Sequence, residues 1–472
     1  MIASSSLAWG TAIGLALGVA YTASPLTVWF GIVMIGLFVW AGRGLTDRER
    51  RYVWGILAAA VVIRVLAIAA LSLTNNRYLP VSFFWDGDGM FLKMRATVIR
   101  NVWLGIPNNP HDLFLSFQRG YGWTTYLYVL AYLQYLTGPA PYGVHLFNVA
   151  LFVAAAVLLY RLVRSAYGRT PALLGLVLVV FLPSLIAWSV SALKESLYIF
   201  LCALGLAAAV AIVRAKGIAE RAWWITLLAG TVAANSEVRV GALLIMVTGV
   251  AVGCVGTILV RRAGLVVLVL ALSPFVAFRL WDNLGAQVHA DLEERIMSQV
   301  KNSAVAHTGN VRTPGNHYKL LDQRLYSGNA IAAMTSAEGR RFAIRALLSV
   351  VFVPLPWQVQ STSEIVFLAQ QVVWYLLVVF AAVGLIAGLR RDALVTCMLA
   401  GMTAAGGAVI AFNSGNIGTM VRLRDTVVPF VLWLSALGIV ATISTIMSGS
   451  VRSKSRALEA WPSAGGQHRV CD

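Results

Sequence analysis

The chain has 472 residues, of which 59% are hydrophobic and only 12% are charged, and its mean hydropathy is +0.77. A soluble domain of this length cannot bury so much apolar surface, so the composition excludes that class and predicts an all-α polytopic membrane protein. The net charge is +18, but the basic residues lie mostly in short loops between apolar segments. This favours contact with membrane lipids over binding to nucleic acid.

About twelve apolar runs are long enough to predict membrane-spanning helices. They cover residues 7–23, 26–41, 53–73, 144–162, 172–190, 197–213, 223–234, 240–260, 265–278, 365–389, 393–412 and 427–447. Two further runs, 121–136 and 342–357, are predicted to be interfacial helices, because every alternate short loop is then basic and cytoplasmic. We therefore expect both termini in the cytoplasm and the chain in a bacterial inner (plasma) membrane.

This topology divides the chain into three parts. Residues 1–52 form an N-terminal transmembrane hairpin, which could dock to a partner. Residues 53–447 form one integrated transmembrane domain with extracytoplasmic loops at 74–143 and 279–364, and residues 448–472 form a basic cytoplasmic tail. Arg64 lies in the middle of the run 53–73, and we expect it to turn towards the interior of the bundle.

Charged residues collect at the helix ends that this topology places outside the cytoplasm. In chain order they are Asp86, Asp88, Lys194, Glu195, Arg239, Arg422 and Arg424. Ionisable groups at membrane depth are costly and usually face a cavity, so we expect one shared cavity at this face. A carboxylate can take a proton from a hydroxyl nucleophile, and Arg and Lys can hold phosphate oxygens. The combination favours a reaction with a lipid-linked phosphate as leaving group.

The same stretches resemble the membrane glycosyltransferases of the GT-C type, especially protein O-mannosyltransferases and lipid A aminoarabinose transferases. Members of that group carry a catalytic acid in the first long extracytoplasmic loop, which corresponds here to Asp86 or Asp88 after the helix at 53–73. The stretches 183–200, 353–357 and 418–429 also look like this group. The resemblance runs from about residue 53 to residue 447. Phe91 stands where the group commonly has tyrosine, and the N-terminal hairpin is additional to the usual core.

The resemblance implies a GT-C-like fold and transfer of a sugar, with inversion, from a polyprenyl-phosphate donor to an extracytoplasmic glycan, lipid or protein. Asp86 or Asp88 is then the general base, and the choice between them stays open. The residues expected to bind the substrate phosphate are Lys194, Glu195, Arg239, Arg422 and Arg424. We assign no cofactor from the sequence, with a divalent cation bridging Asp86 and Asp88 as the alternative.

Each of these motifs could also have a purely structural role. The two aspartates could form an ordinary Asp-Gly turn, Lys194 and Glu195 a local ion pair, and Arg422 and Arg424 interfacial anchors. For the whole chain, one alternative is a polysaccharide repeat-unit polymerase that uses lipid diphosphate-linked oligosaccharide, with Arg340 and Arg341 near the diphosphate. Another is a transporter or flippase of lipid-linked sugars, although no internal repeat is evident in the sequence.

Overall fold

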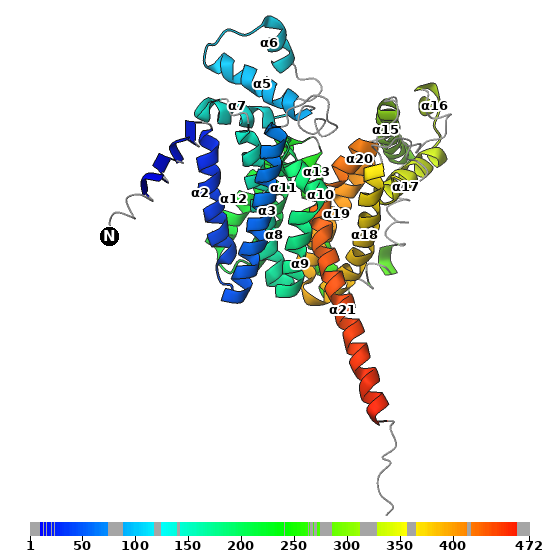
Figure 1. The fold of residues 1–472 in the computed structure, drawn as a ribbon. Coiled ribbons are helices and arrows are strands. Elements are labelled where there is room, and N and C mark those ends of the chain that lie inside the picture. The colour runs from blue at the N-terminus through cyan, green and yellow to red at the C-terminus, as the bar shows by residue number, and fades with distance from the viewer. Residues whose placement is uncertain are drawn as a thin grey trace, which may run out of the picture.

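The computed structural model describes residues 24–73, 88–117, 124–138, 142–239, 241–262, 286–311, 328–355, 365–412 and 417–459, together with scattered residues between 10 and 22 and between 264 and 273. All regular secondary structure within these ranges is helical. The helices run mostly side by side in one bundle, with short helices gathered at one end of it (Figure 1).

Eight of the described helices are long and apolar enough to cross a membrane. They are α2 (Pro25–Gly42), α3 (Asp47–Leu73), α8 (Gly143–Tyr167), α11 (Glu195–Arg214), α13 (Ala242–Arg261), α18 (Ile365–Arg391), α19 (Ala393–Ala411) and α21 (Val428–Glu459). A ninth span is formed if the bent pair α9 (Arg169–Phe181) and α10 (Pro183–Ser189) is counted as one. The prediction of an all-α integral membrane protein is thus confirmed.

The remaining three of the twelve expected spans have different outcomes. Residues 223–234 lie within α12 (Ile218–Val238), which is helical throughout but is not among the eight candidates. The described residues of the run 7–23 are helical, but they form only a shorter apolar helix, Gly10–Val19. The run 265–278 falls mostly outside the described residues. The described part of the chain therefore supports up to nine spans.

The break between α9 and α10 is built around Pro183 and Arg64. Proline cannot donate a backbone hydrogen bond and its ring clashes with the preceding turn, and here the two helices meet at 60°. Arg64 of α3 donates through Nη1 to the carbonyl oxygen of Val180 (2.9 Å), and through Nε to the hydroxyl of Ser189 (2.8 Å). The expectation that Arg64 points into the bundle is confirmed, and its guanidinium ties the two halves of the bent span together.

Helices that are not among the candidate spans cover one end of the bundle (Figure 1). On one side are α5 (Asp88–Trp103), α6 (Pro110–Phe117) and α7 (Tyr126–Thr137), and on the other are α15 (Ala286–Val311), α16 (Gly328–Ala332) and α17 (Ser336–Phe352). At 1.5 Å per residue, the 12 residues of α7 reach only about 18 Å, which is too short for a hydrocarbon core of about 30 Å. The two runs expected to be interfacial, 121–136 and 342–357, thus contribute α7 and α17 to this end.

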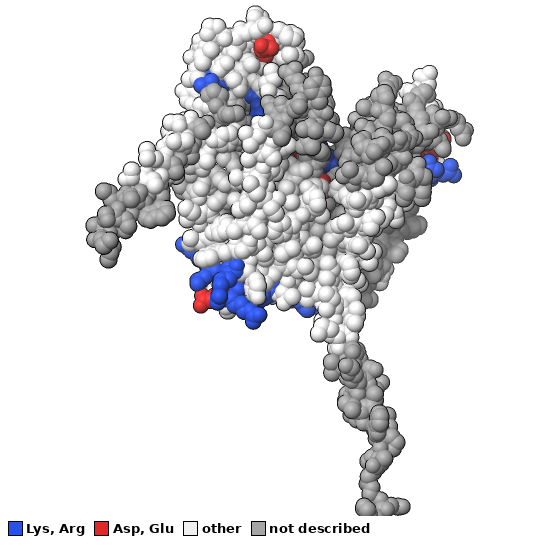
Figure 2. All heavy atoms as spheres, viewed as in Figure 1, with Lys and Arg blue, Asp and Glu red and all other residues white. Residues whose placement is uncertain are grey.

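The opposite end of the bundle is basic. Figure 2 shows an uncharged belt with Lys and Arg gathered along the lower rim, below the ends of α2, α3, α8 and α9. One acid is built into this rim: Glu49 is buried and accepts two hydrogen bonds from Arg164, at 2.7 and 2.9 Å, and one from Tyr160. The two ends of the bundle therefore differ in charge.

Glycines set the closest helix contact in the bundle, between α18 and α21. A Cβ added at Gly384 would overlap the carbonyl oxygen of Leu434, and one added at Gly438 would overlap the carbonyl oxygen of Phe380. Small residues allow such close approach of helix backbones, which is the main source of helix association in a membrane.

We expect Gly384→Ala to destabilise the bundle by about 1–3 kcal/mol, because the added methyl group must push α18 away from α21. Thermal unfolding in detergent measures this as a lowered Tm. Gly36→Ala on α2 is the matched control, since nothing lies within 4 Å of its added Cβ. An equal Tm for both variants would contradict the close packing.

Candidate functional site

The centre of the candidate site is the start of α11, which follows the turn at residues 190–194. Glu195 is the first residue of this helix and is 2% exposed. Its Oε1 accepts a hydrogen bond from Nε of Arg422, on α20 (Ile417–Arg424), at 2.9 Å. Among the described residues, the acid is thus paired with an arginine 227 positions away and forms no salt bridge with its neighbour Lys194.

Two more cations lie close to this ion pair. Arg239, immediately after α12, places its Cζ 5.3 Å from the ring centroid of Tyr198, and its buried Nη1 has no hydrogen-bond partner in the described part of the chain. Burial and the neighbouring charges of Arg239 and Arg422 lower the pKa of Lys194. Three cations thus surround one carboxylate, and an unsatisfied N–H group adds to the preference of this place for an anion.

The end of the acidic loop lies against the same turn. Asp88 is the first residue of α5, whereas Asp86 and the side chain of Asp88 lie outside the described residues. At the next position, a Cβ added to Gly89 would meet the Cβ of Ala192 at 3.5 Å. The start of α5 therefore packs against Ala192, two residues before Lys194. That Asp86 and Asp88 share a site with Lys194 stays a prediction, because their side chains lie outside the described residues.

A polar contact also ties α5 to the bundle. Nζ of Lys93 lies 3.3 Å from Nε2 of His145, which is fully buried near the start of α8. Nδ1 of the same ring lies 2.8 Å from the carbonyl oxygen of Val190, in the turn before α11. The imidazole thus connects the covering helix to the turn that precedes Lys194 and Glu195.

Arg424 has a different set of partners from Arg422. It is 1% exposed, and its Nη1 donates to the carbonyl oxygen of Val353 (3.1 Å) and to Oε1 of Gln371 (2.8 Å). Its Cζ lies 4.9 Å from the ring centroid of Trp374, and burial lowers its pKa to about 10. Residues two apart on a helix point in nearly opposite directions, so the two arginines contact different neighbours of α20.

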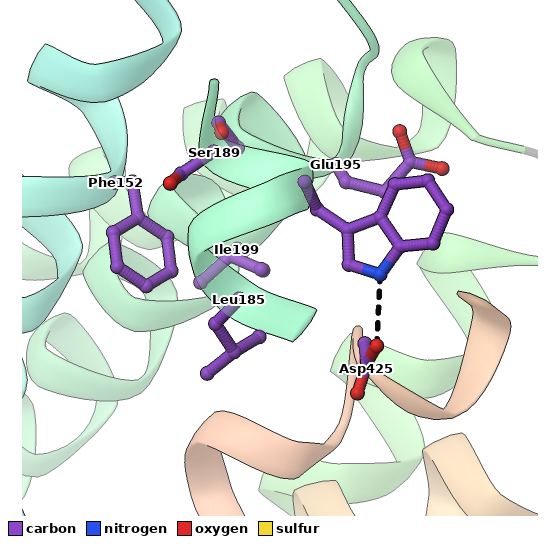
Figure 3. Close-up of a pocket in the computed structure, with 8 residues that line it drawn as sticks. Phe152, Leu185, Ser189, Glu195, Ile199 and Asp425 are labelled. Carbon is purple, nitrogen blue, oxygen red and sulfur yellow. Dashed lines mark hydrogen bonds between the residues drawn. The ribbon is translucent and has the colours of Figure 1, made fainter. Parts of the chain in front are cut away.

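A narrow pocket lies beside the ion pair (Figure 3). Apolar side chains form one side of it, and the carboxylates of Glu195 and Asp425 lie on the other. Its lining consists of Phe152, Leu185, Trp188, Ser189, Glu195, Ser196, Ile199 and Asp425. Oε2 of Glu195 and Oγ of Ser196 are buried there without a hydrogen-bond partner among the described residues. Of the predicted site residues whose side chains the structure describes, Glu195 alone lines this pocket.

Asp425 is a component of the site that was not predicted from the sequence. Its carboxylate accepts hydrogen bonds from Nε1 of Trp188 (2.8 Å, dashed in Figure 3), from the hydroxyl of Ser184 (3.1 Å) and from the side-chain amide of Gln370 (3.3 Å). Burial raises its pKa to about 6, against these hydrogen bonds, which lower it. An acid directly before the last apolar run was a signal that could have found it.

The structure leaves the divalent-cation alternative untested. The described residues contain no group of three or more His, Cys, Asp or Glu side chains that could hold a metal ion. The alternative depends on Asp86 and Asp88, whose carboxylates are not among the described side chains.

Comparisons with known proteins add no relative: no family model, no curated protein and no solved structure matches this chain.

Asp425 predicts a pH-dependent stability. Since its pKa is raised from 3.8 to about 6, the fold favours the neutral carboxyl, and this contribution is complete below about pH 4 and lost as the pH rises through about 6. Asparagine resembles the neutral form. Asp425→Asn should therefore become more stable than the parent protein as the pH rises from about 4 to above 6, by up to about 3 kcal/mol. Tm values of both proteins measured from pH 4 to 8 check this, and a pH-independent difference would contradict it.

Proposed function

We propose that this chain is a membrane glycosyltransferase that moves a sugar from a polyprenyl-phosphate donor to an acceptor outside the cytoplasm. The proposal rests on one observation: Lys194, Arg239 and Arg422 lie close together near the start of α11. The first turn of α5, which follows the acidic loop, packs against Ala192 just before Lys194. A phosphate-holding group and a nearby acid, both at a membrane surface, are the two requirements of such a transfer.

The proposed reaction uses the acid of the loop and the three cations near the start of α11. The carboxylate of Asp86 or Asp88 accepts the proton of the acceptor hydroxyl as the hydroxyl oxygen forms a bond to the anomeric carbon. The bond between that carbon and the phosphate oxygen breaks, and the electron pair leaves with the lipid phosphate. Lys194, Arg239 and Arg422 hold that phosphate and stabilise the charge that develops on it. Attack opposite to the leaving group inverts the anomeric carbon, in line with the resemblance to GT-C enzymes.

The basic rim supports one orientation of the bundle in the membrane. Lys and Arg gather at the end of the bundle opposite to α5, α7 and α17 (Figures 1 and 2), and short loops rich in these residues stay in the cytoplasm. This supports a cytoplasmic position for the basic rim and an extracytoplasmic position for the candidate site. The apolar belt between them supports direct access of a lipid-linked donor from the bilayer.

Two alternative functions would give different products. A repeat-unit polymerase would use a lipid diphosphate, with Arg340 and Arg341 of α17 as added cations, and the released lipid would then carry two phosphates. A flippase would move the lipid-linked sugar without breaking the glycosidic bond. Analysis of the released lipid by mass spectrometry separates the three, since a lipid monophosphate is the product only of the transfer proposed here.

Replacing the catalytic acid tests the proposed chemistry. We expect Asp86→Asn or Asp88→Asn to reduce transfer from a labelled polyprenyl-phosphate sugar by about 10²–10⁴-fold, because asparagine cannot take the proton. Asp112→Asn, an exposed acid on α6, is the matched control and should keep full activity. Full activity in both Asp86 and Asp88 variants would overturn the mechanism.

Replacing a phosphate-binding cation should act mainly on the donor. Each of Lys194→Gln and Arg239→Gln should weaken transfer at low donor concentration by about 10- to 100-fold, the loss expected for one charge-assisted hydrogen bond. Kinetics at varied donor and fixed acceptor concentration measure this. Arg345→Gln, an exposed arginine on α17, controls for a general loss of positive charge, and an equal effect of all three variants would contradict a local phosphate site.

A further inference from the structure

Asp425 is a buried acid with no direct part in the reaction described above. It lies in the turn between α20 and α21 and is 2% exposed. Its shortest hydrogen bond, at 2.8 Å, comes from the indole N–H of Trp188 on α10. A buried acid is costly unless it is hydrogen-bonded, and at Asp425 the hydrogen bond from Trp188 also affects a neighbour of that indole.

The indole that Asp425 holds is also a contact surface for Arg422. Cζ of Arg422 lies 5.6 Å from the ring centroid of Trp188, within the range of a cation–π interaction. Nε of the same guanidinium donates a hydrogen bond to Oε1 of Glu195. One carboxylate and one aromatic face therefore both contact the arginine, and the indole that provides this face donates a hydrogen bond to Asp425.

We propose that Asp425 is a positioning residue that keeps Arg422 ready to bind a lipid-linked phosphate, acting through the indole of Trp188. The proposal rests on the proposed function, since that function supplies the phosphate ligand. A cation–π contact depends on where the ring lies, and an indole that donates its N–H to a fixed acceptor has little freedom to turn away. The side chain of Arg422 is a quarter exposed, so it is held in place without being fully buried.

The geometry also shows why Asp425 acts on one cation in particular. Arg239 has a separate aromatic support, Tyr198, and the only indole that donates to Asp425 among the described residues is that of Trp188. Loss of Asp425 should therefore weaken the contribution of Arg422 to binding and leave that of Arg239 in place.

The test is binding of a polyprenyl monophosphate, without sugar, to the full chain in lipid nanodiscs. We expect Asp425→Ala to weaken binding by about 3- to 30-fold, the loss that corresponds to one cation–π contact. Trp188→Phe, which keeps a ring but removes the N–H that Asp425 holds, should also weaken binding, and the double variant should be no worse than Asp425→Ala. In an Arg422→Ala background, Asp425→Ala should cause no further loss.

Two matched variants separate positioning from general damage to the fold. Asp425→Asn keeps an oxygen that can accept from Trp188, and Ser184→Ala removes a hydrogen bond to the other oxygen only. Both should bind within about twofold of the parent protein, the scatter expected when the cation–π geometry is intact. If Asp425→Ala itself does not fold, the comparison of Trp188→Phe in the presence and absence of Arg422 decides the question by the same criterion.

The outcomes distinguish this inference from the proposed function. Normal binding by Asp425→Ala, or an equal loss with and without Arg422, overturns the positioning role while Arg422→Ala still weakens binding. Normal binding by Arg422→Ala overturns both, because the phosphate site itself then does not include this arginine.

Discussion

The ion pair between Arg422 and Glu195 is the interaction on which the candidate site depends. It joins the short helix before the last span to the first turn of α11, and both partners are largely buried, at 25% and 3% side-chain exposure. A carboxylate at the N-terminus of a helix is also favoured by the helix dipole. Breaking such a pair would leave an uncompensated charge at membrane depth. The ion pair therefore fixes the position of α20 against α10 and α11, and with it the places of Trp188 and Asp425.

The membrane explains why these charges are found together. Hydrocarbon offers no partner for a charge, so each ionisable side chain must find one in the protein or lie at a surface. Arg64 illustrates the first solution, because it serves the freed carbonyl of the bent span α9–α10. Lys194, Arg239 and Arg422 illustrate the second, as three cations against one paired acid at the covered end of the bundle. An excess of positive charge in such a place favours an anionic ligand over a purely structural network.

Much of the fold could be predicted because hydrophobic length and loop charge are local properties. The runs that became α3, α8, α11 and α19 were recognised directly, and the loop charges identified α7 as a helix outside the spans. The contact of Arg422 with Glu195 could not be predicted, since it joins residues 227 positions apart and depends on how α20 packs. For the same reason the sequence pattern did not distinguish Arg422 from Arg424, although they contact different neighbours.

Asp425 was missed because its hydrogen bonds to Trp188, Ser184 and Gln370 come from helices that meet only in the folded bundle.

In the proposed function, the end of the bundle covered by α5 and α7 receives the phosphate of a lipid-linked donor. Photo-crosslinking tests it most directly, with a polyprenyl-phosphate analogue that carries a diazirine next to the phosphate and with the labelled peptides mapped by mass spectrometry. We expect labelling at residues 188–195 and 417–425, reduced by competition with unmodified polyprenyl phosphate. Competable labelling confined to the basic rim, at residues 43–51, 161–169 and 390–392, would contradict it.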